Sequence, residues 1–90
     1  MSNQINKAIF QEGHAIFVNS KKEQKALINF LEELGFKLMY EELRNDSKLY
    51  PCWCVQGDSF GLVGTQALRG IKKEKIFQNL GDFRSYSRIF

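Results

Sequence analysis

The chain has 90 residues, of which 43% are hydrophobic and 13% aromatic, so it can hold one hydrophobic core but not two. Domains need a metal or disulfide scaffold mainly below about 40 residues, and the aromatic content excludes a disordered chain. The net charge of +3 is modest. However, residues 69–90 carry six Lys and Arg against two acids, while residues 1–68 carry seven against eight. We therefore expect an acidic partner to dock on the C-terminal segment.

The lack of a recognisable targeting signal and the spacing of the cysteines predict a cytoplasmic protein. No apolar run approaches the roughly 20 residues that span a bilayer. The first residues lack a basic stretch followed by an apolar core, so we expect no secretion signal and no membrane association. Cys52 and Cys54 would point the same way on a strand, at a separation that does not suit a disulfide. A reducing compartment is therefore expected.

The first predicted strand is a run of β-formers from His14 to Val18 that leads into a helix. Residues 7–10 are candidates for its hairpin partner, through a turn at Glu12-Gly13. An N-terminal arm is the alternative for those residues.

The clearest element is a helix over residues 21–34. Ser20 and Glu23 form the S-x-x-E capping box, in which each side chain accepts a hydrogen bond from the other residue's backbone N–H. One face of the helix is apolar and consists of Leu27, Phe30, Leu31 and Leu34. Gly35 stands where a left-handed residue ends a helix, and Phe36 can then fold back on the last turn.

A further strand and a hairpin are predicted after the helix. Residues 36–40 are expected to return alongside the first strand, and the polar residues 41–48 to form a loop or a charged strand end. Pro51 marks a strand start or a sheet edge.

The hairpin consists of strands over residues 52–56 and 59–63. They flank Gly57-Asp58, which suits a type II′ turn. The resulting register sorts the side chains by face. One face carries Trp53, Val55, Phe60 and Leu62, and the other carries Cys52, Cys54, Gly61 and Val63.

The C-terminal part predicts a second helix and a tail. Gly70 is expected to break any helix that begins near Thr65. The spacing of Ile76, Phe77 and Leu80 predicts a short second helix over residues 72–80. Residues 83–90 alternate basic and aromatic side chains, which predicts an extended tail or an edge strand.

Together these elements predict a single α+β domain over residues 1–90. We expect a small, mainly antiparallel sheet of about three to five strands. Helix 21–34 should pack on the face that carries Trp53, Val55, Phe60 and Leu62. The sequence contains no internal repeat and no linker.

The residue types that support catalysis or metal binding do not form a recognisable set. His14, the single histidine, falls at an expected exposed turn, and nothing in the sequence brings it to Cys52 or Cys54. Structural zinc usually needs four ligands, and a nucleophile needs an adjacent base. Glu32-Glu33 and Glu41-Glu42 are adjacent carboxylates of the kind that usually face water. We expect no enzyme activity, no metal and no cofactor.

The C-terminal segment supplies the candidates for partner binding, because Arg and aromatic groups together suit both protein interfaces and nucleic-acid stacking. These candidates are Arg69, Lys72, Lys73, Lys75, Arg84, Tyr86, Arg88 and Phe90. A separate anion site is predicted at Ser20, Lys21 and Lys22, where helix 21–34 begins. A solvated helix end is the alternative, since the capping box already uses some of the free N–H groups there.

One combination of elements resembles a known group of proteins. A strand that ends near Val18, a capped helix that leaves through Leu34-Gly35-Phe36, and a hairpin over residues 53–63 are similar to features of small accessory proteins of phages and prophages. The resemblance covers about residues 14–64, and Lys37-Leu38 stands where such proteins often carry a Trp. It implies binding to a host or phage protein, for example inhibition of a host enzyme, and it assigns no functional residue.

The leading hypothesis is a non-catalytic module that binds another protein with an acidic surface, as an accessory protein or inhibitor would. The alternative is nucleic-acid binding through residues 69–90, which would weaken steeply as salt rises. An exposed strand edge would also allow a homodimer.

Overall fold

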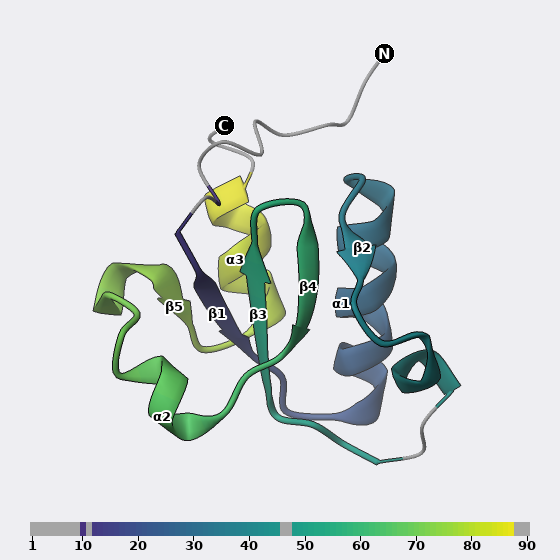
Figure 1. Ribbon diagram of the computed structural model, residues 1–90. Coiled ribbons are helices and arrows are strands. Elements are labelled where there is room, and N and C mark those ends of the chain that lie inside the picture. Colours follow the sequence, from purple (N-terminus) through teal and green to yellow (C-terminus); the bar gives the residue numbers. More distant parts are fainter. Residues whose placement is uncertain (1–9, 11, 46–47, 88–90) are drawn as a thin grey trace.

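The computed structural model describes residue 10, residues 12–45 and residues 48–87 (Figure 1). Five strands form one sheet in the order β2-β4-β3-β1-β5. The elements in chain order are β1 (His14–Phe17), α1 (Lys21–Glu33), β2 (Lys37–Leu38), the 3-10 helix η2 (Glu41–Asn45), β3 (Cys52–Gln56), β4 (Ser59–Leu62), α2 (Thr65–Leu68), the 3-10 helix η3 (Lys73–Lys75), β5 (Ile76–Phe77) and α3 (Leu80–Ser87).

Helix α1 begins and ends where its local sequence predicts. The Ser20 hydroxyl accepts a hydrogen bond from the Glu23 N–H at 3.1 Å, as an N-cap residue does. At the other end Gly35 has a φ of 96°, which a residue without a Cβ adopts easily. The Phe36 N–H then bonds to the Leu31 carbonyl at 3.0 Å, which completes a Schellman stop.

Glu23 differs from its expected role in the capping box. Its Oε1 accepts from the N–H of Asn19, not from that of Ser20. Its Oε2 accepts from the Leu80 N–H at 2.9 Å, which is the first N–H of α3. One carboxylate therefore satisfies a free N–H at the start of two helices and holds their N-terminal ends together.

The β3–β4 hairpin has the predicted register. Trp53 pairs with Leu62 and Val55 pairs with Phe60. Gly57 has a φ of 65°, and no described non-glycine residue has a positive φ, so only the first central position of the turn is left-handed, as in type II′. Trp53, Val55 and Phe60 are fully buried, but Leu62, near the strand's end, is 38% exposed.

The two edge strands differ from the expectations. Strand β2 does not lie beside β1; it pairs in parallel with β4, Leu38 opposite Phe60. Both sides of β1 are taken by β3 and β5. The sheet thus has no place beside β1 for the expected hairpin partner, whose residues 7–9 lie outside the described residues. Residues 41–45, expected in a loop or strand end, form η2.

The short helix that the sequence predicts over residues 72–80 is displaced along the chain, because the C-terminal helix α3 spans Leu80–Ser87. The side chain of Asn79 accepts from the Asp82 N–H and caps it. Residues 76–77 form β5 because they pair in parallel with Ala15 and Ile16 of β1. The expectation of an extended tail or edge strand over residues 83–90 is wrong for residues 83–87, which are helical, and residues 88–90 lie outside the described residues.

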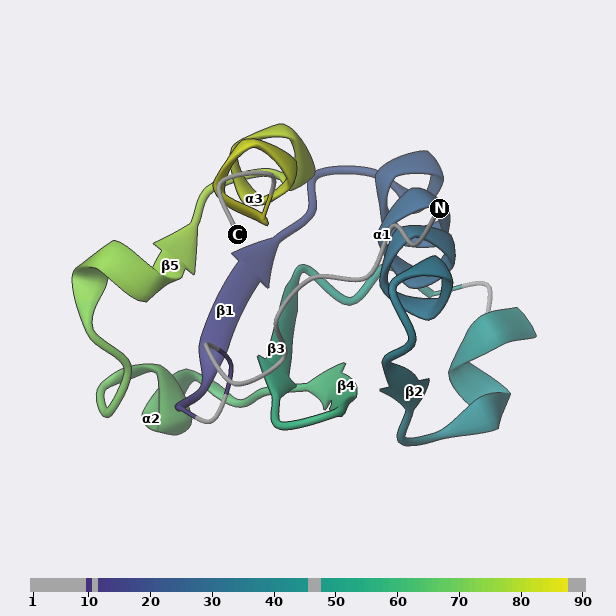
Figure 2. The same ribbon diagram turned by 90° about the horizontal axis from the view of Figure 1, so that it is seen from above.

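Helices α1 and α3 lie side by side on the same face of the sheet (Figures 1 and 2). Phe30 of α1 meets Phe83 of α3 edge to face, with ring centroids 6.0 Å apart. The core lies between this helical layer and the sheet and includes Ile16, Leu27 and Trp53. Short α2 lies on the opposite face (Figure 2). The predicted α+β fold with one principal helix is therefore confirmed; the central strands β4, β3 and β1 are antiparallel, and both edge strands join in parallel.

Candidate functional site

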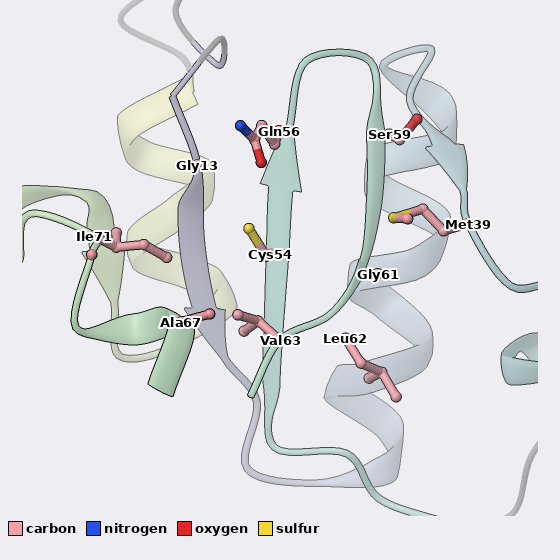
Figure 3. A pocket seen from close by; sticks show the side chains of 11 residues that line it. Gly13, Met39, Cys54, Gln56, Ser59, Gly61, Leu62, Val63, Ala67 and Ile71 are labelled. Carbon is pink, nitrogen blue, oxygen red and sulfur yellow. The ribbon is translucent and has the colours of Figure 1, made fainter. Parts of the chain in front are cut away.

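The face of the sheet that turns away from α1 and α3 carries a groove of about 570 Å³, which we call the outer groove (Figure 3). It runs across β4 and β3 toward the start of β1. Its lining residues are Gly13, Met39, Cys54, Gln56, Ser59, Gly61, Leu62, Val63, Ala67, Gly70 and Ile71. None of them carries a charged side chain, so the groove itself is predominantly apolar.

The alternation of side chains along the hairpin creates this groove. Because neighbours on a strand point to opposite faces, burying Trp53, Val55 and Phe60 turns Cys54 and Gly61 outward. These two residues are small and leave the floor low. Ala67 of α2 and Ile71 of the following segment form one wall, while Met39, just after β2, forms the other (Figure 3).

The groove exposes apolar side chains at one end. Met39 is 60% exposed and Leu62 is 38% exposed, although both border the groove. Tyr40, next to Met39 in the chain, is also exposed. Exposed apolar groups that gather at a concave surface are typical of interaction sites, whereas single ones are common anywhere. The hairpin pattern predicted which residues share this face, but no local signal placed Met39 on it.

The two cysteines lie on the outer face as free thiols. Burial raises the pKa of both Cys52 and Cys54, so both stay protonated at neutral pH. A protonated thiol is a weak nucleophile and a poor metal ligand. Within the described parts of the chain, no three His, Cys, Asp or Glu residues gather in a group that could hold a metal ion.

His14 is not the exposed turn residue that the sequence suggests. It is fully buried as the first residue of β1. Its Nδ1 lies 3.0 Å from the Glu12 carbonyl, and its Nε2 lies 3.3 Å from the Tyr86 hydroxyl. The ring packs edge-on against Phe10 and stacks parallel to Phe77. His14 therefore fastens α3 to the sheet on the core face, opposite the face that holds Cys54.

Burial also lowers the pKa of His14. The unfolded chain, with an ordinary histidine pKa of about 6.5, then takes up a proton before the folded chain does. The free energy of unfolding should therefore fall as pH drops below about 6.5. Urea unfolding of the wild type and of His14→Gln at several pH values checks this. The wild type should lose more stability on acidification than the variant, and equal losses would contradict this role of His14.

The structure distributes the predicted partner-binding residues over two regions. Arg69, Lys72 and Lys73 are exposed in the segment between α2 and β5, and Lys75 in the same segment forms an ion pair with Glu12. Arg84 is on α3, where its guanidinium lies 5.0 Å from the centre of the Phe30 ring.

The remaining aromatic and basic candidates are not on an exposed surface that the structure describes. Tyr86, expected to be a free aromatic, is partly buried; its ring lies 4.9 Å from that of Phe77 and packs against the core. Arg88 and Phe90 lie outside the described residues. The predicted basic and aromatic tail is therefore not one continuous patch among the described residues.

At the predicted anion site, some of the polar groups around the start of α1 already have partners within the chain. The Ser20 hydroxyl and the Asn19 N–H are both used by Glu23. Lys21 and Lys22 are exposed and line a hollow of about 520 Å³ between α1 and η2. That hollow is not centred on the helix end, so an anion site at Ser20, Lys21 and Lys22 stays a prediction.

Of the adjacent carboxylates singled out in the sequence, Glu32 and Glu41 share Arg44 as a partner. Both oxygens of Glu32 accept from Arg44, which also binds Glu41. The hydrogen bonds from Arg44 lower the pKa of Glu32. This arrangement ties η2 to the last turn of α1, while Glu33 and Glu42 are exposed to solvent.

Comparisons of the chain with protein-family models, with curated proteins and with solved structures found no match. Among the described residues, no helix has both the length and the apolar character that crossing a bilayer requires. The candidate site is therefore assigned from geometry alone.

Proposed function

We propose that this chain is a small, non-catalytic module that binds another protein in the cytoplasm and uses the outer groove to do so. An accessory protein or inhibitor of the kind that phages direct at host proteins would work in this way. The observation that carries the proposal is an apolar groove on the sheet face away from α1 and α3, with Met39 and Leu62 exposed at its edge. Withdrawing such side chains from water favours association.

The groove suits a segment of a protein better than an enclosed small molecule. Small-ligand sites usually bury most of the ligand surface. The outer groove instead lies along the sheet surface, between Met39 and the α2 segment (Figure 3), and it is only partly enclosed. An extended stretch of a partner could lie in it while the surrounding surface adds further contact area.

Nucleic-acid binding through residues 69–90 has less support. Base stacking needs free aromatic rings, and Tyr86 packs against the core. Arg84 and the cations of residues 69–73 lie in separate regions. The salt response still separates the two hypotheses, because binding that depends on phosphate contacts weakens steeply as salt rises.

The test compares a groove-filling variant with a matched control. In Gly61→Val the new side chain enters the groove beside Met39, whose sulfur would lie 3.2 Å from the added Cβ. The Met39 Cβ and Cγ would lie 3.4 and 3.5 Å from the added Cβ, at ordinary contact distance, so mainly the sulfur of this exposed side chain must shift and the fold should survive. In Gly64→Val the same change meets open space, since no atom lies within 4 Å of the added Cβ.

Tagged wild type, Gly61→Val and Gly64→Val are incubated in parallel with nuclease-treated host lysate. We expect a protein that is retained by the wild type and by Gly64→Val but lost with Gly61→Val, while thermal melts show that all three proteins are folded. A partner retained equally by Gly61→Val would contradict the groove as the binding surface. Loss of all partners after nuclease treatment would favour nucleic-acid binding.

A further inference from the structure

The outer groove continues into a second hollow at its β1 end. This hollow, of about 300 Å³, is lined by Glu12, Gly13, Gln56, Gly70, Ile71, Lys72 and Lys75. It shares Gly13, Gln56, Gly70 and Ile71 with the outer groove. The two hollows are therefore neighbours, and we call them together, from Met39 to Lys72, the channel.

The two ends of this channel differ in chemistry. At one end the lining side chains are apolar and include Met39, Val63 and Ala67. At the other end the lining includes the ammonium groups of Lys72 and Lys75. A ligand that fills the channel must therefore be apolar at one end and must meet positive charge at the other.

The basic end has positive charge left over after its internal ion pair. Lys75 binds the carboxylate of Glu12, which neutralises the acidic group that lines this hollow. Lys72 is exposed and takes part in none of the ion pairs among the described residues. Arg69 and Lys73, its neighbours in the chain, are exposed as well, and Glu74 is the single acid of segment 69–75.

Two glycines keep the floor of the channel low. A Cβ at Gly13 would lie 3.3 Å from the Cys54 sulfur, and a Cβ at Gly61 would lie 3.2 Å from the Met39 sulfur. Either addition would enter the space that the channel offers. At these two glycines the floor of the channel is backbone, flanked by the side chains of Cys54 and Met39.

We infer that the channel binds an extended segment of a partner protein, with an apolar side chain seated over Cys54 and Gly61 and a carboxylate at Lys72. This inference rests on the proposed function and adds the chemistry of the partner. Apolar burial supplies affinity at one end, and the charge pair sets direction and register at the other. An acidic–apolar peptide meets both conditions. A purely apolar segment meets only the first, and a basic segment is repelled at Lys72.

A displayed library of random short peptides tests the inference even while the partner is unidentified. The library is selected on the wild type after removal of all peptides that bind Gly61→Val. We expect enriched sequences that combine an aromatic or large aliphatic side chain with a nearby Asp or Glu. The best synthetic peptide is then titrated against the wild type, Lys72→Glu and Lys25→Glu, the last being an exposed lysine on α1 as the charge-matched control.

We expect Lys72→Glu to weaken binding of this peptide by about tenfold or more, and Lys25→Glu to change it little, because only the first opposes the peptide carboxylate directly. Peptides that require an open Gly61 but carry no acid, or bind Lys72→Glu as tightly, would overturn the charge inference and leave the proposed function standing. A library without any peptide sensitive to Gly61→Val overturns the inference too, and the lysate experiment then decides the proposed function separately.

Discussion

Replacing Phe83 by Ala should lower the free energy of unfolding by about 3–5 kcal/mol. Phe83 is fully buried, and its ring contacts Phe77, Phe30 and Phe10, with centroids 5.3, 6.0 and 5.8 Å away. The smaller side chain would leave a cavity where α3 meets both α1 and the sheet. Denaturant unfolding followed by far-ultraviolet circular dichroism measures the loss.

The control for Phe83→Ala is Ser85→Ala, an exposed position on the same helix that should change stability by less than about 0.5 kcal/mol. Should Phe83→Ala fail to fold, Phe83→Leu keeps the test quantitative with a loss of about 1–2 kcal/mol. A change near zero for both Phe83 variants would mean that residues 83–87 are the loose tail that the alternation of basic and aromatic residues suggests.

Replacing Leu31 by Ala should cost about 2–5 kcal/mol, because Leu31 is fully buried where α1 lies on the sheet. The lost contacts are those that fix the principal helix above Trp53 and its neighbours. The denaturation midpoint should fall while the denaturant dependence of the free energy stays the same, as expected if only stability changes.

Asn29→Ala is the matched control for Leu31→Ala, since Asn29 is exposed on the same helix. Its effect on stability should lie within about 0.5 kcal/mol. If Leu31→Ala proved as mild as this control, α1 could not be packed with its apolar stripe on the sheet.

The elements that are predictable from the sequence are those whose structure depends on close neighbours. The start of α1 depends on Ser20 and Glu23, and its end on Gly35 and Phe36. The hairpin turn depends on Gly57, and it fixes the register of β3 and β4. Such short-range interactions leave a direct signature in the sequence.

The errors concern interactions between residues far apart in the chain. Ile76, Phe77 and Leu80 have a helical spacing, but Ile76 and Phe77 pair with β1 as an edge strand and Leu80 begins α3. The local sequence suggests an exposed turn at His14. The burial of this residue is not predictable locally, because its partner Tyr86 lies 72 residues away in the chain. Local propensity cannot reveal either contact, since tertiary pairing overrides it.

Some signals of α3 are present in the sequence. Asn79 is a favourable N-cap residue, and Leu80, Phe83 and Ser87 then recur on one helical face, where all three are buried. The alternation of basic and aromatic residues over residues 83–90 suggests an extended tail or edge strand instead. For the candidate site, the hairpin pattern predicts the outward face of Cys54 and Gly61, but only the fold places Met39 and residues 67–72 around it.

The account depends most on one feature, namely that both helices cover the same face of the sheet and leave the opposite face open. Nuclear Overhauser effects from the Met39 methyl group test this most directly. We expect contacts from that methyl to Gly61 on the outer face, together with contacts between the rings of Phe30 and Phe83 on the helical face. Contacts from the Met39 methyl to Leu27 or Leu31 of α1 would contradict the open face and, with it, the outer groove.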